Sequence, residues 1–518
     1  MQISSPAPMQ RRWIYLLAVV AGGLAPLIYA PFGWSLLALV IPGVLFSLVL
    51  RLPRRLAFEA AYLHGVAYYA AGGHWIWYSV GEFGGGQLVA TVFCVLLALG
   101  FGLLTLAVVV LAWALKPRQR LLMLLLTLPA AWVLLEWVQS WLFTGTTWLQ
   151  LGYSQTDGWL GAYAPLIGPL GISLLLAILA GGLVAAVLAR RLSAVCLAVT
   201  AVLASWLGGA VLDRDWTEPA GEPLQVALLQ GNVAQDEKWE PDNRVRTLEL
   251  YRRLNERHLG VDLIVWPETA VPAFHHHVID SYLVPVAEEA AEHGTDLLLG
   301  IPSYDADSGR IFNSVLALGQ NVGFYHKRHL VPFGEYVPFR GLLGGALDVF
   351  GAPMSDFSAG WRAEPLSVAG QRAAVSICYE ITFPNEVRDF LPEATLLVNV
   401  SNDGWFGTSI GPHQHFQISR MRARETGRPL LRSTNTGITA AVDHRGRIIA
   451  SVPQFSVEAL ATEITPMQGS TLYTRTGDLP VLLVVFAMLL ISGGLSWRHR
   501  RRQTPEAGAG DGSSRQEP

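Results

Sequence analysis

Long runs of apolar residues occupy the first two fifths of the chain. A run of about 20 mostly apolar residues is long enough to cross the hydrocarbon core of a membrane. Eight such runs are present, at residues 13–30, 34–50, 56–80, 87–115, 121–142, 160–189, 193–212 and 479–497. This pattern predicts a polytopic α-helical membrane protein with eight spans, seven of them within residues 1–212 and the eighth at residues 479–497.

Between residues 213 and 478 the pattern changes to short β-rich runs separated by turns and helical stretches. Strands are expected at residues 224–233, 262–269, 296–303, 313–319, 372–380 and 395–403, and near residues 437–450 and 457–464. Helices are expected between them, at residues 243–258, 286–294, 382–391 and 414–427. Strands that alternate with helices predict an α/β layered domain.

The charged residues separate the same two parts of the chain. Of 518 residues, 51% are hydrophobic and only 15% are charged, against about 25% charged residues in an average soluble domain. Residues 213–478 hold 22 Lys and Arg against 33 Asp and Glu, a net charge of −11, whereas the rest of the chain has a net charge of +8. This composition excludes a wholly soluble or disordered protein, and the overall charge of −3 predicts no nucleic-acid partner.

Basic residues lie in alternate loops of the predicted membrane part. Lys and Arg occur near residues 11–12, 51–55, 116–120, 190–191 and 498–502, whereas the loops near residues 31–33, 81–86 and 143–159 contain none. Because cytoplasmic loops are enriched in Lys and Arg, both termini are expected in the cytoplasm and residues 213–478 outside it. In a bacterium with two membranes this means the inner membrane, with the α/β domain in the periplasm. Residues 498–518 are expected to form a disordered cytoplasmic tail.

Three residues of the α/β domain are candidates for acyl transfer through a thioester. Their spacing alone does not join them, since Cys378 also fits a small buried hydrophobic residue, Glu268 a surface strand end and Lys327 a solvated loop charge. Glu268, Lys327 and Cys378 lie at or near the ends of predicted strands, where sites of α/β folds are usually found. A carboxylate takes the thiol proton, and a lysine stabilises the oxyanion of a tetrahedral intermediate. A helix N-terminus and a nearby lysine are expected to stabilise the Cys378 thiolate. Cys94 and Cys196 lie in apolar spans and are interpreted as small buried hydrophobic residues.

Other patterns suggest other chemistry. The segment GTSIG at residues 407–411 fits a serine nucleophile elbow at Ser409, with Asp443 and His444 downstream. The predicted strand ends near residue 403, however, and an elbow should follow a strand at once. Unevenly spaced histidines, His275, His276, His277, His413 and His415, do not form a zinc motif, so no metal site is predicted.

The membrane part leaves two questions open. Glu136, within a predicted span, is either a group that forms a packing hydrogen bond or one that lines a pathway. The aromatic-rich outer segment at residues 143–158 is a candidate lining for a lipid-facing mouth. A transporter or sensor whose outer domain only binds a ligand is a third functional class, but the few ionisable residues in the spans argue against it.

Five segments, in order, resemble a known family. They are QGNVAQDEKW, VWPETA, YHKRHLVPFGEYVP, ICYE and VSNDGWFGTSIGPHQHFQISRMRARETGRPLLRSTNTGITA. They are similar to the nitrilase (carbon–nitrogen hydrolase) superfamily and, more closely, to its apolipoprotein N-acyltransferase family. The resemblance implies a nitrilase-like αββα sandwich in which Glu268 is the general base, Lys327 stabilises the oxyanion and Cys378 is the nucleophile.

The same resemblance implies a set of supporting residues. Glu335 would support Lys327, and the loop at residues 334–339 would be a mobile, apolar lip near the bilayer. The other supporting or substrate-binding candidates are Trp239, Tyr379, Glu380, Asn313 and Asn402.

The implied reaction has two steps and needs no cofactor. Cys378 takes an acyl chain from a phospholipid, and the N-terminal amine of a diacylglyceryl-cysteine apolipoprotein then takes it from the thioester. The acyl chain passes from ester to thioester to amide, so no nucleotide is required. The alternative is a membrane-tethered nitrilase-type amidase or hydrolase, which has the same three residues but transfers the acyl group to water.

Overall fold

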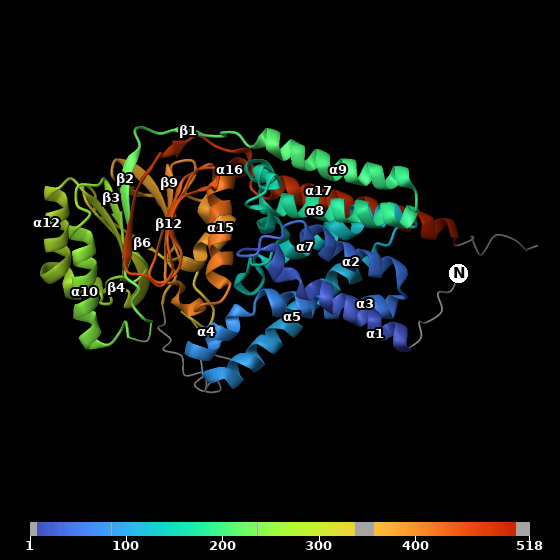
Figure 1. The fold of residues 1–518 in the computed structure, drawn as a ribbon, viewed down its shortest axis with the longest axis horizontal. Coiled ribbons are helices and arrows are strands. Elements are labelled where there is room, and N and C mark those ends of the chain that lie inside the picture. The colour runs from blue at the N-terminus through green and yellow to red at the C-terminus, as the bar shows by residue number, and fades with distance from the viewer. Residues whose placement is uncertain (1–7, 84, 236, 337–356, 504–518) are drawn as a thin grey trace, which may run out of the picture.

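The computed structural model describes residues 8–83, 85–235, 237–336 and 357–503. A bundle of apolar helices lies beside a β-sandwich, and the long axis of the molecule runs through both (Figure 1). The helices of the bundle are α1 (Pro8–Gly23), α2 (Leu37–Arg51), α3 (Arg54–Gly72), α4 (Trp75–Phe83), α5 (Gly86–Ala114), α6 (Arg120–Leu122), α7 (Leu128–Gln139), α8 (Ala164–Ala189), α9 (Leu192–Leu212) and α17 (Leu479–Gln503). The disordered tail expected at residues 498–518 is wrong for residues 498–503, which continue α17, and the rest of it lies outside the described residues.

Six helical segments among the described residues are long and apolar enough to cross a membrane, compared with the eight expected spans. They are Met9–Ile28, Gly86–Ala114, Arg120–Gln139, Trp159–Ala189, Leu192–Leu212 and Leu479–His499. The second expected span, α2, has only 15 residues. The third breaks after Gly72 into α3 and α4, and Arg54, Arg55 and Glu59 lower the apolar content of α3. The polytopic character is therefore confirmed, but the number of eight is not.

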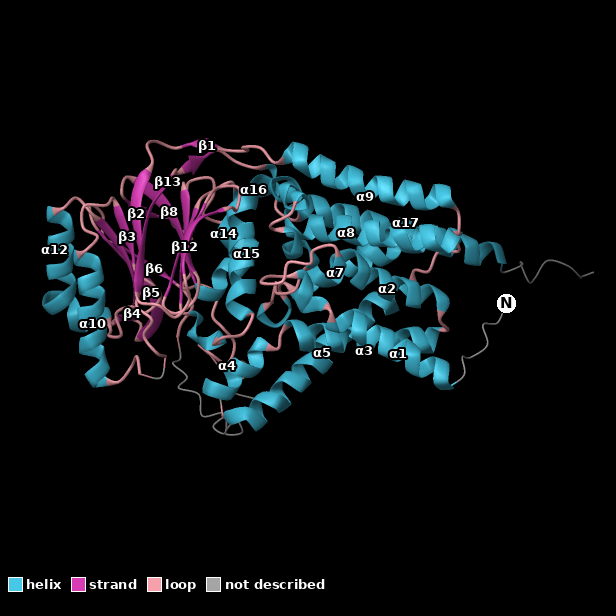
Figure 2. Cartoon of the chain, viewed as in Figure 1, coloured by secondary structure: helices cyan, strands magenta, loops and turns pink. Residues whose placement is uncertain are grey.

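The sandwich contains two six-stranded sheets, which lie between helices (Figure 2). The first sheet has the order β13 (Glu458–Ile464), β2 (Leu224–Gln230), β3 (Leu263–Val265), β4 (Asp296–Asp305), β5 (Arg310–Leu318), β6 (Gly323–His326). The second has the order β12 (Ile448–Val452), β11 (Thr439–Val442), β10 (Leu430–Thr434), β9 (Leu396–Ser401), β8 (Gln371–Ile377), β7 (Leu366–Val368). A short pair, β1 (Glu218–Pro219) and β14 (Met467–Gln468), lies apart from them.

Alternating side chains of each sheet face two different cores. Val226 and Leu228 of β2 pack in the core between the sheets, whereas Ala227 and Leu229 pack toward α10 (Pro241–Glu256) and α12 (Val284–Glu292). On the other side, α15 (Gly411–Thr426) covers the second sheet. The order helix, sheet, sheet, helix confirms the expected αββα sandwich. Strand β10 (Leu430–Thr434) was not predicted, although Gly427 and Pro429 mark a turn between α15 and this strand.

Helix α15 also joins the sandwich to the membrane part. The indole Nε1 of Trp148 donates to Gln414 at 2.7 Å, and Thr147 donates to the carbonyl of Thr382 at 2.7 Å. Trp148 is only 5% exposed. The central residues of the outer segment at residues 143–158 form a buried platform under the sandwich, and the expected lining of a lipid-facing mouth stays a prediction. Glu136 supports this platform by accepting a hydrogen bond from the Leu151 amide at 3.0 Å, so it is a packing residue.

Candidate active site

Glu268, Lys327 and Cys378 each follow a strand of the sandwich. Lys327 comes directly after β6 and Cys378 directly after β8, while Glu268 lies three residues past the end of β3. Their exposed fractions are 7%, 1% and 9%. Three polar side chains are rarely buried in this way unless each has a partner, so the contacts between them decide what this site can do.

A single amide joins the two buried carboxylates of the site. Asn313 on β5 donates from Nδ2 to Oε1 of Glu268 at 2.7 Å and to Oε1 of Glu335 at 3.0 Å. The other oxygen of Glu335 lies 2.7 Å from Lys327 Nζ. Glu268 Oε2 is buried and has no hydrogen-bond partner among the described residues. This leaves one carboxylate oxygen available to accept a proton, as a general base requires.

The charges of the cluster support opposite roles for Glu268 and Lys327. Burial raises the pKa of Glu268, while the nearby Lys327 cation lowers it in part, so the carboxylate binds a proton more readily than an exposed one. Burial disfavours the charged form of Lys327, but the carboxylates of Glu335 and Glu268 outweigh it and raise the pKa of Lys327 well above its usual range. Lys327 therefore stays cationic and is suited to stabilise a negative charge.

The backbone of Cys378 is held in an unusual conformation. Its φ of 54° lies in the left-handed region, which is costly for a residue with a Cβ. Two buried side chains hold its carbonyl oxygen, His415 Nε2 at 3.1 Å and Asn399 Nδ2 at 3.3 Å. Burial and the Arg432 cation lower the pKa of His415. His415 Nε2 donates to the Cys378 carbonyl, and its Nδ1 lies 3.0 Å from Arg432 Nη2 and 3.2 Å from Asp403 Oδ1, so buried polar groups surround the ring on both sides.

The expectation of a stabilised thiolate was wrong. Burial and the Glu268 carboxylate raise the pKa of the Cys378 thiol to about 12, although Lys327 lowers it in part. The segment that follows is a short 3₁₀-helix, Cys378–Thr382, rather than a long α-helix with a strong N-terminal field. The resting group is therefore a thiol, and it needs a base to become a nucleophile.

Glu380 connects the Lys327 loop to the Cys378 turn. Its Oε2 accepts from the amide of Ile377, the residue before Cys378, at 2.7 Å. Its Oε1 accepts from the amides of Arg328 at 2.5 Å and His329 at 3.1 Å, which directly follow Lys327. One carboxylate thus fixes both segments. Glu380 is a positioning residue because its hydrogen-bond partners are backbone amides and the hydroxyl of Tyr325 rather than the candidate nucleophile.

The remaining expected residues lie in different environments. Tyr379 donates to the carbonyl of Gly145 at 3.2 Å and so contacts the membrane-side platform. Asn402 caps the turn after β9 and accepts from Asn435 at 3.1 Å, which makes it a structural residue of the sandwich. Trp239 is 51% exposed, and within the described part of the chain no hydrogen bond or ring contact joins it to the cluster. The apolar lip expected at residues 334–339 lies partly outside the described residues.

The sequence analysis missed Lys238 as a site residue. Lys238 is 1% exposed and donates from Nζ to Thr269 Oγ1 at 2.6 Å and to the backbone carbonyl of Glu268 at 3.1 Å. A lysine in a polar segment gives no sign of burial, and its place beside Trp239 in the QGNVAQDEKW segment was the only available signal. The importance of His415 was also missed, since it was considered only as a metal ligand.

Comparison with known proteins places the two parts of the chain in one family. Residues 225–472 match the carbon–nitrogen hydrolase model, and residues 21–182 match the apolipoprotein N-acyltransferase N-terminal domain. The chain is 42% identical over 495 residues to the apolipoprotein N-acyltransferase of Methylococcus capsulatus, which covers 94% of this chain and 96% of the relative. The chain belongs to the apolipoprotein N-acyltransferase family.

Further relatives of this family match along nearly the same length. The apolipoprotein N-acyltransferase of Azotobacter vinelandii is 40% identical over 500 residues, with 95% of this chain and 96% of the relative covered. Among solved structures, a CN-hydrolase superfamily protein from Xanthomonas campestris is 19% identical, with a TM-score of 0.36, and covers 51% of this chain and 97% of its own.

The serine alternative does not fit the structure of this family member. Ser409 directly precedes α15, and its hydroxyl accepts from the Gly411 amide at 3.2 Å. His444 pairs with Asp215 at 2.5 Å. The loop that holds His444 contacts Arg420 of α15 through the carbonyl of Gly446. Arg420 lies 11 residues beyond Ser409, which is about three turns along the helix, so His444 is too far away to act as its base. No histidine-rich metal cluster is present among the described residues either.

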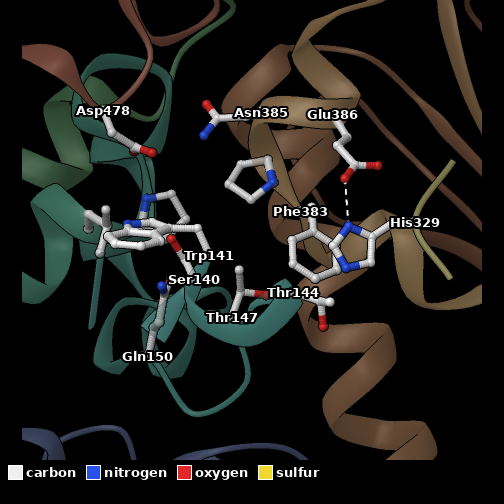
Figure 3. A pocket seen from close by; sticks show the side chains of 13 residues that line it. Ser140, Trp141, Thr144, Thr147, Gln150, His329, Phe383, Asn385, Glu386 and Asp478 are labelled. Atoms are coloured by element: carbon white, nitrogen blue, oxygen red, sulfur yellow. Dashed lines mark hydrogen bonds and ion pairs between the residues drawn. The ribbon is translucent and has the colours of Figure 1, made fainter. Parts of the chain in front are cut away.

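A polar pocket of about 210 Å³ adjoins the site where the membrane part meets the sandwich (Figure 3). His329 and Phe383 line its sandwich side, and Asp478 lines its membrane side. His329 Nδ1 lies 2.7 Å from Glu386 Oε1, as the dashed line in Figure 3 marks. The candidate nucleophile does not line this pocket, which lies next to the Lys327 loop rather than over the thiol.

Proposed function

We propose that this chain transfers a fatty acyl chain from a phospholipid to the N-terminal amine of a diacylglyceryl-cysteine apolipoprotein. The observation that supports this most directly is the buried cluster of Glu268, Asn313, Glu335 and Lys327 next to the strained Cys378 turn. Such a cluster combines a base, a fixed cation and a thiol. Family membership supports the choice of lipid substrates.

In the first step Glu268 takes the proton of the Cys378 thiol as Sγ attacks the ester carbonyl of the phospholipid. The negative charge that develops on the carbonyl oxygen is stabilised by the Lys327 ammonium. The carbon–oxygen bond then breaks, and Glu268 returns the proton to the departing glycerol oxygen. The products are a lysophospholipid and an acyl thioester on Cys378.

In the second step the amine of the apolipoprotein attacks the thioester. Glu268 accepts a proton from the amine nitrogen, and Lys327 again stabilises the oxyanion. When the carbon–sulfur bond breaks, Sγ takes the proton back and the thiol is restored. The acyl chain ends in an amide, which is more stable than the starting ester. The overall transfer therefore runs downhill without a nucleotide, although the thioester between them is less stable than the ester.

Contacts of the sandwich with the membrane helices support access to lipid substrates. Ser79 on α4 donates to the carbonyl of Trp405 at 2.7 Å, and Phe83 and Trp405 make an edge-to-face contact at 4.7 Å. On α5, Phe93 makes a similar contact at 5.8 Å with Phe333, two residues before Glu335. Two apolar helices thus reach the loops around the site, where water would otherwise compete for the thioester.

The proposed orientation follows from the basic loops. Both termini lie in the cytoplasm, the sandwich lies in the periplasm of a bacterium with two membranes, and residues 213–478 form the catalytic domain. Along the chain, the membrane spans in residues 1–212 precede this domain, and the span at residues 479–497 follows it. Lys and Arg on one side of the bundle support this arrangement.

Intact-protein mass spectrometry after incubation with phospholipid tests the proposal. Wild type is expected to gain the mass of one fatty acyl chain, which hydroxylamine and a diacylated N-terminal-cysteine peptide both remove. Cys378→Ala is expected to gain none, and Ser409→Ala serves as the matched control because it removes a nearby hydroxyl outside the cluster. An acyl adduct that persists in Cys378→Ala would contradict the proposal.

The same experiment separates the transferase from the hydrolase alternative. If water alone removes the acyl group as fast as the lipidated amine does, the chain is a tethered hydrolase. If the adduct is stable for many minutes in water and is lost on addition of the amine, with the peptide gaining the acyl mass, the chain is a transferase.

A further inference from the structure

A second pocket, of about 350 Å³, lies where the membrane part meets the far end of α15. Four arginines line it from the sandwich side, namely Arg420 and Arg424 on α15 and Arg445 and Arg447 between β11 and β12. Asp157 and Asp213 line it from the membrane side, together with Trp159 at the start of the 3₁₀-helix η5 (Trp159–Tyr163). Neither family resemblance nor the proposed reaction uses this pocket.

The pocket has an excess of positive charge. Three aspartates pair with the four arginines: Asp157 with Arg420 at 2.5 Å, Asp213 with Arg424 at 3.1 Å and Arg447 at 2.6 Å, and Asp215 with Arg445 at 2.7 Å. The lining itself holds four arginines and only two aspartates, Asp157 and Asp213, so the wall of the pocket is positive. Asp215 and Asp443 are not among the lining residues, and Asp443 accepts from the backbone amides of Arg445 and Arg447. A phosphodiester, with one negative charge, would lower the positive charge of this wall.

Arginine donors remain available to a ligand. The Arg447 side chain is 58% exposed, and its Nε and Nη1 make no hydrogen bond to any described residue. Arg424 is buried, at 8% exposed, so its guanidinium is fixed in place at the base of the pocket. A guanidinium forms strong, charge-assisted hydrogen bonds with the oxygens of an anionic group such as a phosphate, which a neutral polar group cannot match.

The pocket lies at the level where lipid head groups are expected. Helix α9 has 21 residues and ends at Leu212, one residue before Asp213. At about 1.5 Å per residue it spans about 30 Å, the thickness of the hydrocarbon core. Trp159 is 52% exposed at this level, as aromatic residues at the membrane interface often are. Gly209 fixes the junction, because a Cβ there would lie 2.2 Å from the Trp159 carbonyl oxygen.

Helix α9 also offers a surface for acyl chains. It lies at the edge of the bundle (Figure 1), and Gly209 is its only fully buried residue among those described. Large apolar side chains are exposed along it: Leu192, Leu197, Leu203, Leu207 and Val211. A lipid with its phosphate in the arginine pocket would place its chains along this surface.

The pocket is separate from the candidate active site. His415 on α15 faces Cys378, whose carbonyl it contacts. At 100° per residue, Arg420 and Arg424 lie about 140° and 180° around the helix from His415. The two arginines therefore point to the opposite side of α15, away from the thiol.

We propose that this arginine pocket binds the phosphodiester of a membrane phospholipid whose acyl chains lie along α9. The bound lipid would bridge the sandwich and the membrane part at a site distinct from the acyl donor site. Positive pockets between membrane helices and a polar domain bind lipid head groups by this chemistry.

A photo-crosslinking titration with the full-length, detergent-purified protein tests the proposal. The probe is an ether-linked phosphatidylglycerol with a diazirine in one chain, which cannot donate an acyl group, so the result does not depend on the proposed reaction. Crosslinks to residues 192–212 are expected in wild type. Arg447→Gln is expected to weaken this crosslinking by about tenfold or more, the loss typical of a hydrogen bond to a charged group. Arg362→Gln, at an exposed arginine outside the pocket, is the matched control.

A second variant gives a change of opposite sign. Asp157→Asn is expected to tighten binding, because it releases Arg420 and raises the excess charge. Inorganic phosphate is added in a parallel arm to compete with the lipid. Equal crosslinking of α9 in wild type, Arg447→Gln and Asp157→Asn would overturn the proposal, as would equal crosslinking by a phosphate-free diacyl glycolipid. Complete competition by millimolar inorganic phosphate would also overturn it, by showing that free phosphate rather than a lipid is bound.

Discussion

Replacing Glu380 by glutamine should damage both stability and the acylation step. The carboxylate is 1% exposed and accepts four hydrogen bonds, from the amides of Ile377, Arg328 and His329 and from the hydroxyl of Tyr325. Four donors that converge on two oxygens require an acceptor without hydrogens. Glutamine supplies one oxygen and one NH₂ group. At least one backbone N–H that now donates to Glu380 would therefore face the NH₂ group, which is also a donor.

The size of the effect follows from these contacts. In the least costly orientation the NH₂ group faces the Ile377 amide, and one buried donor is left without a partner at a cost of about 1–3 kcal/mol. The three bonds to Oε1 pass from a charged to a neutral acceptor and lose about 0.5 kcal/mol each. The total is about 2.5–4.5 kcal/mol. For a domain of this size that is a decrease of about 5–18 °C in the unfolding temperature.

Thermal unfolding in detergent and single-turnover formation of the acyl thioester measure the two effects. The acylation rate is expected to fall more than the affinity for phospholipid, because Glu380 sets the relative positions of the Lys327 loop and the Cys378 turn and touches neither substrate. Glu393→Gln is the matched control, since Glu393 is exposed and pairs loosely with Arg372 at 3.6 Å. If both variants unfold at the same temperature and acylate at the same rate, the positioning role of Glu380 is refuted.

Three further outcomes are expected. Lys238→Met should move the acidic limb of the pH profile of kcat/KM to higher pH, because the Lys238 cation lowers the pKa of Glu268 and its removal lets that pKa rise. A lower kcat with an unchanged acidic limb would show that Lys238 has only a structural role. Alkylation of Cys378 by iodoacetamide, followed by peptide mass spectrometry, should accelerate about tenfold per pH unit from pH 7 to 9, since the thiol pKa is raised to about 12 and only the thiolate reacts; a rate that is fast and independent of pH would contradict the buried thiol. In intact spheroplasts a membrane-impermeant maleimide should label Ser308→Cys but not Arg118→Cys until the membrane is opened, and the reverse pattern would invert the proposed orientation.

Local patterns in the sequence were enough for the class of most elements. Apolar runs predicted the membrane helices, and most predicted strands overlap an observed strand, as residues 224–233 overlap β2 and residues 296–303 overlap β4. Helix α3 departs from prediction because a span also needs low charge and an unbroken helix. Gly72 ends α3, and the next helix begins only at Trp75. Strand β10 was missed because its extended backbone is stabilised by pairing with β9 and β11, and a local pattern does not show that pairing.

The sequence by itself determined which residues are candidates for the chemistry, because Glu268, Lys327 and Cys378 lie in motifs that resemble those of one family. Only the tertiary structure decided their surroundings. Asn313 bridges two carboxylates that are 67 residues apart in the chain, and Lys238 is held by Thr269, 31 residues away from it. The thiol pKa is high because desolvation outweighs the nearby cation. Desolvation and long-range hydrogen bonds depend on which segments pack together, and no local pattern records that packing.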